Sequence, residues 1–221
     1  LFRQNFLFVV VPKRRSMSGQ PDIDIRENYI KCLDTELLSI LLKDRSSGKN
    51  IIWATDIYAS KGASYDSWEP ITVKQITGRF GKIIRPRVDK SQKEQKIRIK
   101  DKAEVFTPSW ICNEMNNHLC DEWFEKKDVL NTAKDKNWIV NNNKIPFTNE
   151  KDKTWQDFVK LKVLEISCGE APFLTSRYDT TTGEWIDVNN RIGALDRKLR
   201  VINENCNSEQ DWYNWTLIAF K

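Results

Sequence analysis

The hydrophobic and polar positions along the 221-residue chain follow two different periods. Apolar residues recur every three or four positions over 24–43, which predicts one amphipathic helix that ends at Ser46-Ser47-Gly48. The inner face of this helix is predicted to carry Ile25, Tyr29, Leu33, Leu37, Ile40 and Leu41. Similar spacing predicts helices near 107–124, 154–161 and 192–202, and a last helix capped by Ser208. For the helix that starts near 107, the expected inner side chains are Trp110, Met115, Leu119 and Trp123.

Shorter apolar runs predict strands between these helices. Ile51–Ala54 and Val163–Ile166 each have the composition of a buried strand, and 71–76 fits either a strand or a short helix. Residues 126–153 are polar and asparagine-rich, which favours a hairpin-like insertion, and 180–184 fits the turn of a second hairpin. The mixture of periods indicates an α/β fold.

Composition describes a folded, mildly basic chain. Nine tryptophans are spread through the sequence, and the formal charge is +5. This charge suits a polyanionic partner but does not require one. The five cysteines are odd in number, widely spaced and never in a Cys-x-x-Cys pair, so they indicate neither a disulfide framework nor a zinc site. A reducing cytoplasmic location is expected, and the apolar run Phe6–Val11 is too short to span a membrane.

The strongest local charge lies over 85–102, where lysine and arginine outnumber acidic residues. Ser91 followed by Glu94 predicts a capping box that opens an exposed helix. The segment is either a solvated face or a strip that contacts the phosphates of a nucleic acid.

The candidate site begins where the predicted strand at 163–166 passes into a turn of small residues. Gly169 has no Cβ, so the backbone there could approach a ligand closely. The carboxylate of Glu165 could accept hydrogen bonds from amino or hydroxyl groups of that ligand. The same pattern also fits a strand that merely ends in a turn. Thr107 and Pro108 predict a second feature, a helix with Thr107 as N-cap, whose free N–H groups could hold a carboxylate.

These two features resemble motifs of S-adenosylmethionine-dependent DNA adenine methyltransferases, particularly the modification subunits of restriction systems. The family's first cofactor motif has the pattern Asp-Pro-x-Cys-Gly-Ser-Gly-x-Phe-Leu. The positions that correspond here are Glu165, which stands for the Asp, and Cys168, Gly169, Phe173 and Leu174, which match. The departures are Ile166 for Pro, Glu170 for Ser and Ala171 for the second Gly. Phe106-Thr107-Pro108 matches the Phe-Thr-Pro element that precedes this motif in the family.

The resemblance implies a role for each matching residue. Thr107 and the helix start after Pro108 would hold the methionine carboxylate of the cofactor, and Phe106 would pack beside it. Glu165 would accept from an amino group of the cofactor, Gly169 would allow close approach, and Cys168 would be a small packing residue. Glu170 and Phe173 would complete the loop. No catalytic residue and no metal ligand is assigned.

The resemblance also implies a domain organisation. Residues 104–221 would begin a Rossmann-like methyltransferase domain that is truncated, because the family's later Asn/Asp-Pro-Pro-Tyr/Phe element does not occur in this sequence. A mainly helical region with the basic strip would occupy 17–103, and 1–16 would be a non-native extension. The intact enzyme would methylate the adenine amino group in double-stranded DNA, with restriction or specificity subunits as further partners, and this fragment would be inactive.

Two alternatives remain open at this point. The altered loop residues Ile166, Glu170 and Ala171 favour a non-catalytic module that binds DNA or another subunit. A methyltransferase that acts on RNA or protein is also compatible, because a cofactor motif does not identify the methyl acceptor.

Overall fold

The computed structural model describes residues 27–33, 36–148, 150, 152–166 and 169–220. The expected non-native extension 1–16 therefore lies outside the described residues. The described chain is largely helical with one small sheet, and it divides into two compact units, 24–85 and 86–221. The basic segment 86–102 thus belongs to the same unit as the downstream residues.

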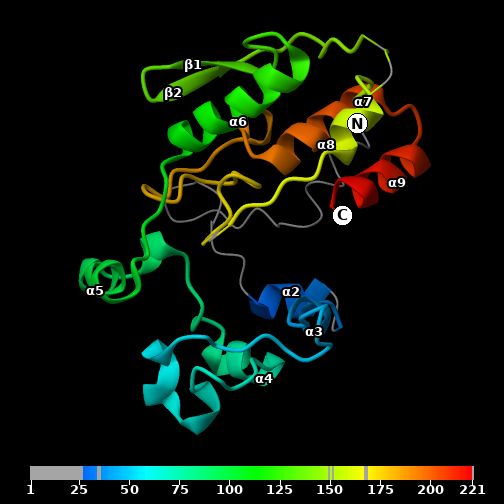
Figure 1. Cartoon of the computed structure of the whole chain (residues 1–221). Helices are drawn as coiled ribbons and strands as arrows, with labels where there is room; N and C mark the ends of the chain where they lie inside the picture. The colour runs from blue at the N-terminus through cyan, green and yellow to red at the C-terminus, as the bar shows by residue number, and fades with distance from the viewer. Residues whose placement is uncertain (1–26, 34–35, 149, 151, 167–168, 221) are drawn as a thin grey trace. The chain divides into compact units, whose positions relative to one another are not determined.

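The first unit is built from short helices around a small apolar core (Figure 1). The helices are α2 (Glu27–Leu33), α3 (Leu37–Leu41) and α4 (Val73–Ile76), with 3-10 turns η1 (Asp56–Lys61), η2 (Ala63–Tyr65) and η3 (Gly78–Phe80). The core consists of Leu38, Leu42, Trp53, Tyr65, Ile71 and Ile76. The helical alternative for 71–76 is confirmed by α4.

Three expectations for this unit were wrong. The single helix predicted over 24–43 is two helices, α2 and α3, among the described residues. Ile40 and Leu41, which were assigned to the inner face of the first helix, are 55% and 57% exposed, and Leu38 and Leu42 are buried instead. The segment 51–54 is not a strand, because its pairing is limited to one antiparallel bridge between Ile52 and Pro70. Two backbone hydrogen bonds flank this bridge, from Ile71 N–H to the Ile51 carbonyl and from Trp53 N–H to the Glu69 carbonyl.

The second unit contains the remaining helices and the sheet. Its helices are α5 (Gln92–Lys102), α6 (Ser109–Phe124), α7 (Trp155–Lys160), α8 (Ala194–Asn205) and α9 (Glu209–Ala219), with 3-10 turns η4 (Arg87–Asp89) and η5 (Val188–Asn190). Strands β1 (Asn131–Lys134) and β2 (Asn137–Val140) form an antiparallel hairpin in which Asn131 faces Val140. Figure 1 shows the hairpin beside α6, and α7, α8 and α9 packed together.

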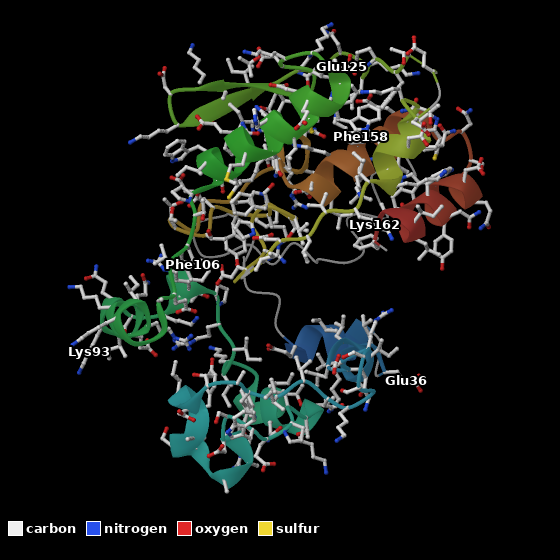
Figure 2. All side chains as sticks on the ribbon, in the orientation of Figure 1. Glu36, Lys93, Phe106, Glu125, Phe158 and Lys162 are labelled. Carbon is white, nitrogen blue, oxygen red and sulfur yellow. The ribbon has the colours of Figure 1, made fainter. Side chains whose placement is uncertain are left out.

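Aromatic rings fill much of the core of this unit. Phe158 of α7, labelled in Figure 2, packs within 5.2–6.3 Å, centroid to centroid, of Trp123, Phe124 and Phe147. Val201 and Ile202 of α8 are fully buried in the same cluster. The core therefore joins the end of α6 to α7 and α8.

The inner face of α6 is polar, which the apolar spacing did not predict. Met115 and Leu119 are 54% and 55% exposed, whereas Asn113 and Asn116 are buried. Asn116 Nδ2 donates to the carbonyls of Phe173 and Ile192. Asn113 meets Arg197 of α8, which is only 3% exposed and therefore needs hydrogen-bond acceptors inside the protein. Its guanidinium donates to Asn113 Oδ1 at 3.0 Å, among other acceptors on α6.

Several local predictions are confirmed. Ser91 and Glu94 form the expected capping box of α5, and Thr154 and Ser208 cap α7 and α9. The insertion at 126–153 contains the β1–β2 hairpin, and Tyr178 pairs with Trp185 across the predicted turn.

The predicted buried strand at Val163–Ile166 is wrong. These residues adopt no regular secondary structure, and Leu164 and Ile166 are 84% and 81% exposed. A strand needs a neighbour that takes its backbone hydrogen bonds, and in the described part of the chain the two strands of the hairpin pair only with each other. Mixed helix and strand is therefore observed, and a parallel sheet is not seen among the described residues. None of the described helices is long and apolar enough to cross a bilayer.

Candidate functional site

The two sequence motifs, sixty residues apart, meet at Phe106 and Gly169. Gly169 has a positive φ of 54°, and a Cβ built on it would lie 3.3 Å from Cε1 of the Phe106 ring. A side chain at this position would therefore be strained by the backbone conformation and would press on the ring. Phe106, labelled in Figure 2, also carries the Arg87 guanidinium 5.4 Å above its ring centroid.

The helix after this ring starts one residue later than predicted. Thr107 is not the N-cap; Pro108 is, with ψ of 147°, and α6 begins at Ser109. Contacts from a distant loop fix this start, because Thr180 Oγ1 donates to the Thr107 carbonyl at 3.1 Å and Ser109 N–H donates to Asp179 Oδ2 at 2.6 Å. The carboxylate at this helix start is thus supplied by the chain itself.

Asp179 is held in its charged form by the same hydrogen bonds. Burial would raise its pKa, but donation from the Thr181 hydroxyl and from the backbone N–H groups of Ser109, Thr181 and Thr182 outweighs burial and lowers the pKa. Asp179 was not identified from the sequence. The signal was present, since Asp179-Thr-Thr-Thr-Gly183 is a typical turn sequence in which the aspartate accepts from the N–H groups that follow it.

Glu165 points toward the loop that follows Gly169. Its Oε2 accepts from Leu174 N–H at 3.2 Å. Burial raises the pKa of Glu165, and the N–H groups of Leu174 and Phe173 oppose that rise. The carboxylate therefore organises the 169–174 loop, as a carboxylate before a ligand-binding loop does.

The neighbouring Glu170 makes structural contacts in place of the serine expected from the resemblance. Its Oε1 accepts from Arg87 N–H at 2.7 Å, and its Oε2 accepts from the Tyr178 hydroxyl at 2.9 Å. Burial, together with the charge of Glu170, raises the pKa of the Tyr178 hydroxyl far above its ordinary value. Glu170 thereby ties the loop to the segment before α5.

Phe173 and Cys112 complete the surroundings of Glu165. The Phe173 carbonyl accepts from Asn116 Nδ2 at 2.9 Å, which anchors the loop on α6. Burial and the negative charges of Glu165 and Asp179 raise the pKa of Cys112 to about 12, so this thiol is not a nucleophile at neutral pH. Cys168 lies outside the described residues.

A network at the start of α8 also holds the loop, and sequence analysis missed it. Asp196 Oδ2 accepts from Ser176 N–H at 2.8 Å and from Gly193 N–H at 3.1 Å, and Ser176 Oγ accepts from Ile192 N–H at 2.7 Å. Glycine at the N-cap followed three residues later by aspartate is a recognisable helix-start signal.

The arrangement therefore has the parts of a binding loop, namely a carboxylate, a left-handed glycine and an aromatic ring at a helix start. Among the described residues, no group of histidine, cysteine and acidic side chains could hold a metal ion. Comparison with known proteins found no match to a family model, to a curated protein or to a solved structure.

Proposed function

We propose that the chain is the N-terminal part of an S-adenosylmethionine-dependent DNA adenine methyltransferase of a restriction-modification system. The observation that supports this most is the contact between Phe106 and Gly169, which belong to the two motifs of the resemblance. Chance matches to two short patterns would have no reason to meet in space. We place the enzyme in the cytoplasm, where its substrate DNA would be.

The residues fit the cofactor in part. Gly169 offers a backbone without a Cβ, and Glu165 offers a carboxylate that already orders the loop. The Thr107 hydroxyl makes no hydrogen bond to any residue that the structure describes, so it remains available to a ligand. The expected role of the helix start fits less well. Asp179 already occupies the Ser109 N–H, and a cofactor carboxylate there would meet like charge.

We therefore assign the methionine carboxylate to Thr107 Oγ rather than to the first N–H of α6. When bound, the cofactor supplies an electrophilic methyl group. Phe106, Glu165 and Gly169 orient it, and an adenine flipped out of the duplex would receive the methyl group on its amino nitrogen. We also propose that the intact protein has a Rossmann-like methyltransferase domain.

Calorimetric titration with S-adenosylmethionine tests the proposal. We expect measurable heat from the unaltered chain and none from Gly169→Val, because the valine would fill the approach to the loop. The matched control is Gly78→Val, at a glycine of similar φ (+62°) with open space around it in the other unit. Absence of heat from the unaltered, folded chain would remove the proposal.

A second candidate function is a non-catalytic DNA-binding module. Helix α5 favours it, because its sequence carries Lys93, Lys96, Arg98, Lys100 and Lys102 against Glu94 and Asp101, and of these Arg98 is paired with Glu104 at 3.2 Å. Lys93 projects outward from α5 in Figure 2, and Ile97 and Ile99 are 47% and 43% exposed. A helix this charged and this exposed has a surface suited to phosphate groups.

Fluorescence anisotropy with a labelled duplex tests whether α5 contacts DNA, which both candidates would bind, and the titration with S-adenosylmethionine distinguishes the two candidates. If α5 contacts phosphates, the triple variant Lys93→Gln, Lys96→Gln, Lys100→Gln should weaken binding and reduce the slope of log affinity against log salt by about three. Lys126→Gln, Lys127→Gln, Lys144→Gln removes equal charge outside the helix. Equal losses from both triples would leave α5 without a specific role.

A further inference from the structure

Three tryptophans surround a cavity that belongs to neither proposal above. The cavity has a volume of about 270 Å³ and lies where the first turn of α6, the hairpin and the 184–190 segment meet. Trp110, Trp138 and Trp185 line it. Phe106, Glu165 and Gly169 do not line it, whereas Ser109 and Asp179 at the start of α6 do, so the cavity adjoins the proposed cofactor site without including its loop.

The cavity walls are held in place by contacts of their own. Trp138 Nε1 donates to the Asn190 carbonyl at 2.8 Å, which fixes this indole on the 184–190 segment. Trp185 lies in the bridge with Tyr178, and Trp110 follows Ser109, whose N–H is bound to Asp179. A preformed aromatic wall reduces the conformational entropy lost on binding.

Carboxylates and cations both surround the cavity. Asp179, Glu184 and Asp187 line it together with Lys136, and the guanidinium groups of Arg177 and Arg191 lie over the ring of Trp185. Glu184 and Asp187 are exposed and so able to meet a ligand from solvent. These two carboxylates are therefore the groups of the cavity that could pair with a cation from solvent.

The chain already places its own cations on these rings. Lys136 Nζ lies 5.9 Å from the Trp110 ring centroid, and the guanidinium groups of Arg191 and Arg177 lie 5.4 and 5.9 Å from that of Trp185. Cations favour the negative faces of indole rings at such distances. Lys136 is exposed at the tip of the hairpin, so its ammonium can move into water when another cation arrives.

We propose that this tryptophan-lined cavity binds an alkylammonium group, either of a free amine or of a lysine side chain, in exchange for the Lys136 ammonium. Its volume corresponds to about nine water molecules at about 30 Å³ each, which is enough for a trimethylammonium head with a short chain. The tryptophan faces and the carboxylates act on the same positive charge. The proposal does not depend on cofactor binding.

Choline and its neutral isostere 3,3-dimethylbutan-1-ol are the probes, and the indole N–H resonances in ¹H–¹⁵N spectra are the readout. We expect saturable shifts with choline and none with the alcohol, because the two differ in charge and hardly in shape. A titration with N-acetyl-lysine methylamide identifies the source, since tighter binding of this amide assigns the site to a protein side chain and tighter binding of choline to a free amine. Equal shifts with choline and with the alcohol would overturn the proposal.

Variants that change the charge of the cavity should change the affinity for choline in opposite directions. Glu184→Gln should weaken choline binding about three- to fivefold, and Lys136→Gln should strengthen it by a similar factor by removing the competing ammonium. Both residues are exposed, so neither change threatens the fold. Glu150→Gln, outside the cavity, and Trp68→Leu, at a tryptophan that is 81% exposed, should leave the affinity unchanged. Weaker binding by Lys136→Gln would show that the site prefers another kind of ligand.

Discussion

Gly193 is predicted to be more sensitive to substitution than glycines with a positive φ. It is the N-cap of α8, with φ of −63°, a conformation that any residue can adopt. A Cβ on Gly193 would nevertheless lie 2.6 Å from the Leu174 carbonyl carbon and 2.7 Å from Asp196 Oδ2. Because a backbone atom blocks the Cβ, rotation of a side chain cannot relieve the overlap.

The cost of Gly193→Ala follows from the bonds that must stretch. Restoring ordinary contact requires the loop to retreat by about 1 Å, since carbon atoms pack at about 3.5–4.0 Å. Ala194 N–H and Leu195 N–H now donate to the carbonyls of Phe173 and Leu174 at 2.8 and 2.9 Å, and that movement would take both bonds beyond hydrogen-bond range. At about 1 kcal/mol each, with a further penalty for unpaired buried groups, the loss is about 2–4 kcal/mol.

Gly183→Ala is the matched control in the same unit. Gly183 has φ of +79°, and its added Cβ would meet Val88 Cγ2 at 3.2 Å, a side-chain contact that can yield. We expect a cost of about 1 kcal/mol from the backbone conformation. Hydrogen–deuterium exchange of peptides from α8 measures the free energy of opening in both variants. A cost for Gly183→Ala equal to or above that for Gly193→Ala would refute the reasoning.

Further predictions concern the loop and the segment before it. Ala171 has φ of +53°, so Ala171→Gly should stabilise the chain by about 0.5–1 kcal/mol in urea unfolding. Asp179→Asn should cost about 1 kcal/mol at pH 7. The pKa of Asp179 is lowered in the folded state. The difference in stability between the two proteins should therefore reach its full size above the unfolded pKa of about 3.9 and vanish as the pH falls through the folded pKa. Gly169→Ala should cost about 1–2 kcal/mol, and less when combined with Phe106→Leu in a double-mutant cycle. Leu164→Lys should change stability by less than about 0.5 kcal/mol, as expected for an exposed site, whereas a buried leucine would cost several times more.

Features determined by neighbours three or four residues apart could be predicted from the sequence. Ser91 and Glu94 cap α5 through their own side chains, and Thr154 does the same for α7. The hairpin at 131–140 likewise depends on a local turn. These contacts require no knowledge of the rest of the fold, so pattern and composition were sufficient.

The misassigned features depend on distant residues. The polar inner face of α6 follows from Arg197, which is eighty-four residues from its acceptor Asn113. The start of α6 at Ser109 follows from Asp179, which is seventy residues away. Apolar spacing reports only which side chains avoid water, and it carries no information about a buried guanidinium or a carboxylate supplied by another loop. The meeting of Phe106 and Gly169 was inferred from the resemblance and not from periodicity.

The exposed segment 162–166 connects the fold to the proposed function. The Glu165 side chain turns inward to the Leu174 N–H, and alternation along an extended chain then directs Leu164 and Ile166 outward, where they are 84% and 81% exposed. Burying two such side chains is worth about 1.5–3 kcal/mol each, so covering this surface would be favourable. A groove of about 530 Å³ runs along it and is lined by Val163, Leu174 and Phe220, among others. An element that packed in this groove would cover Leu164, whose side chain lines it.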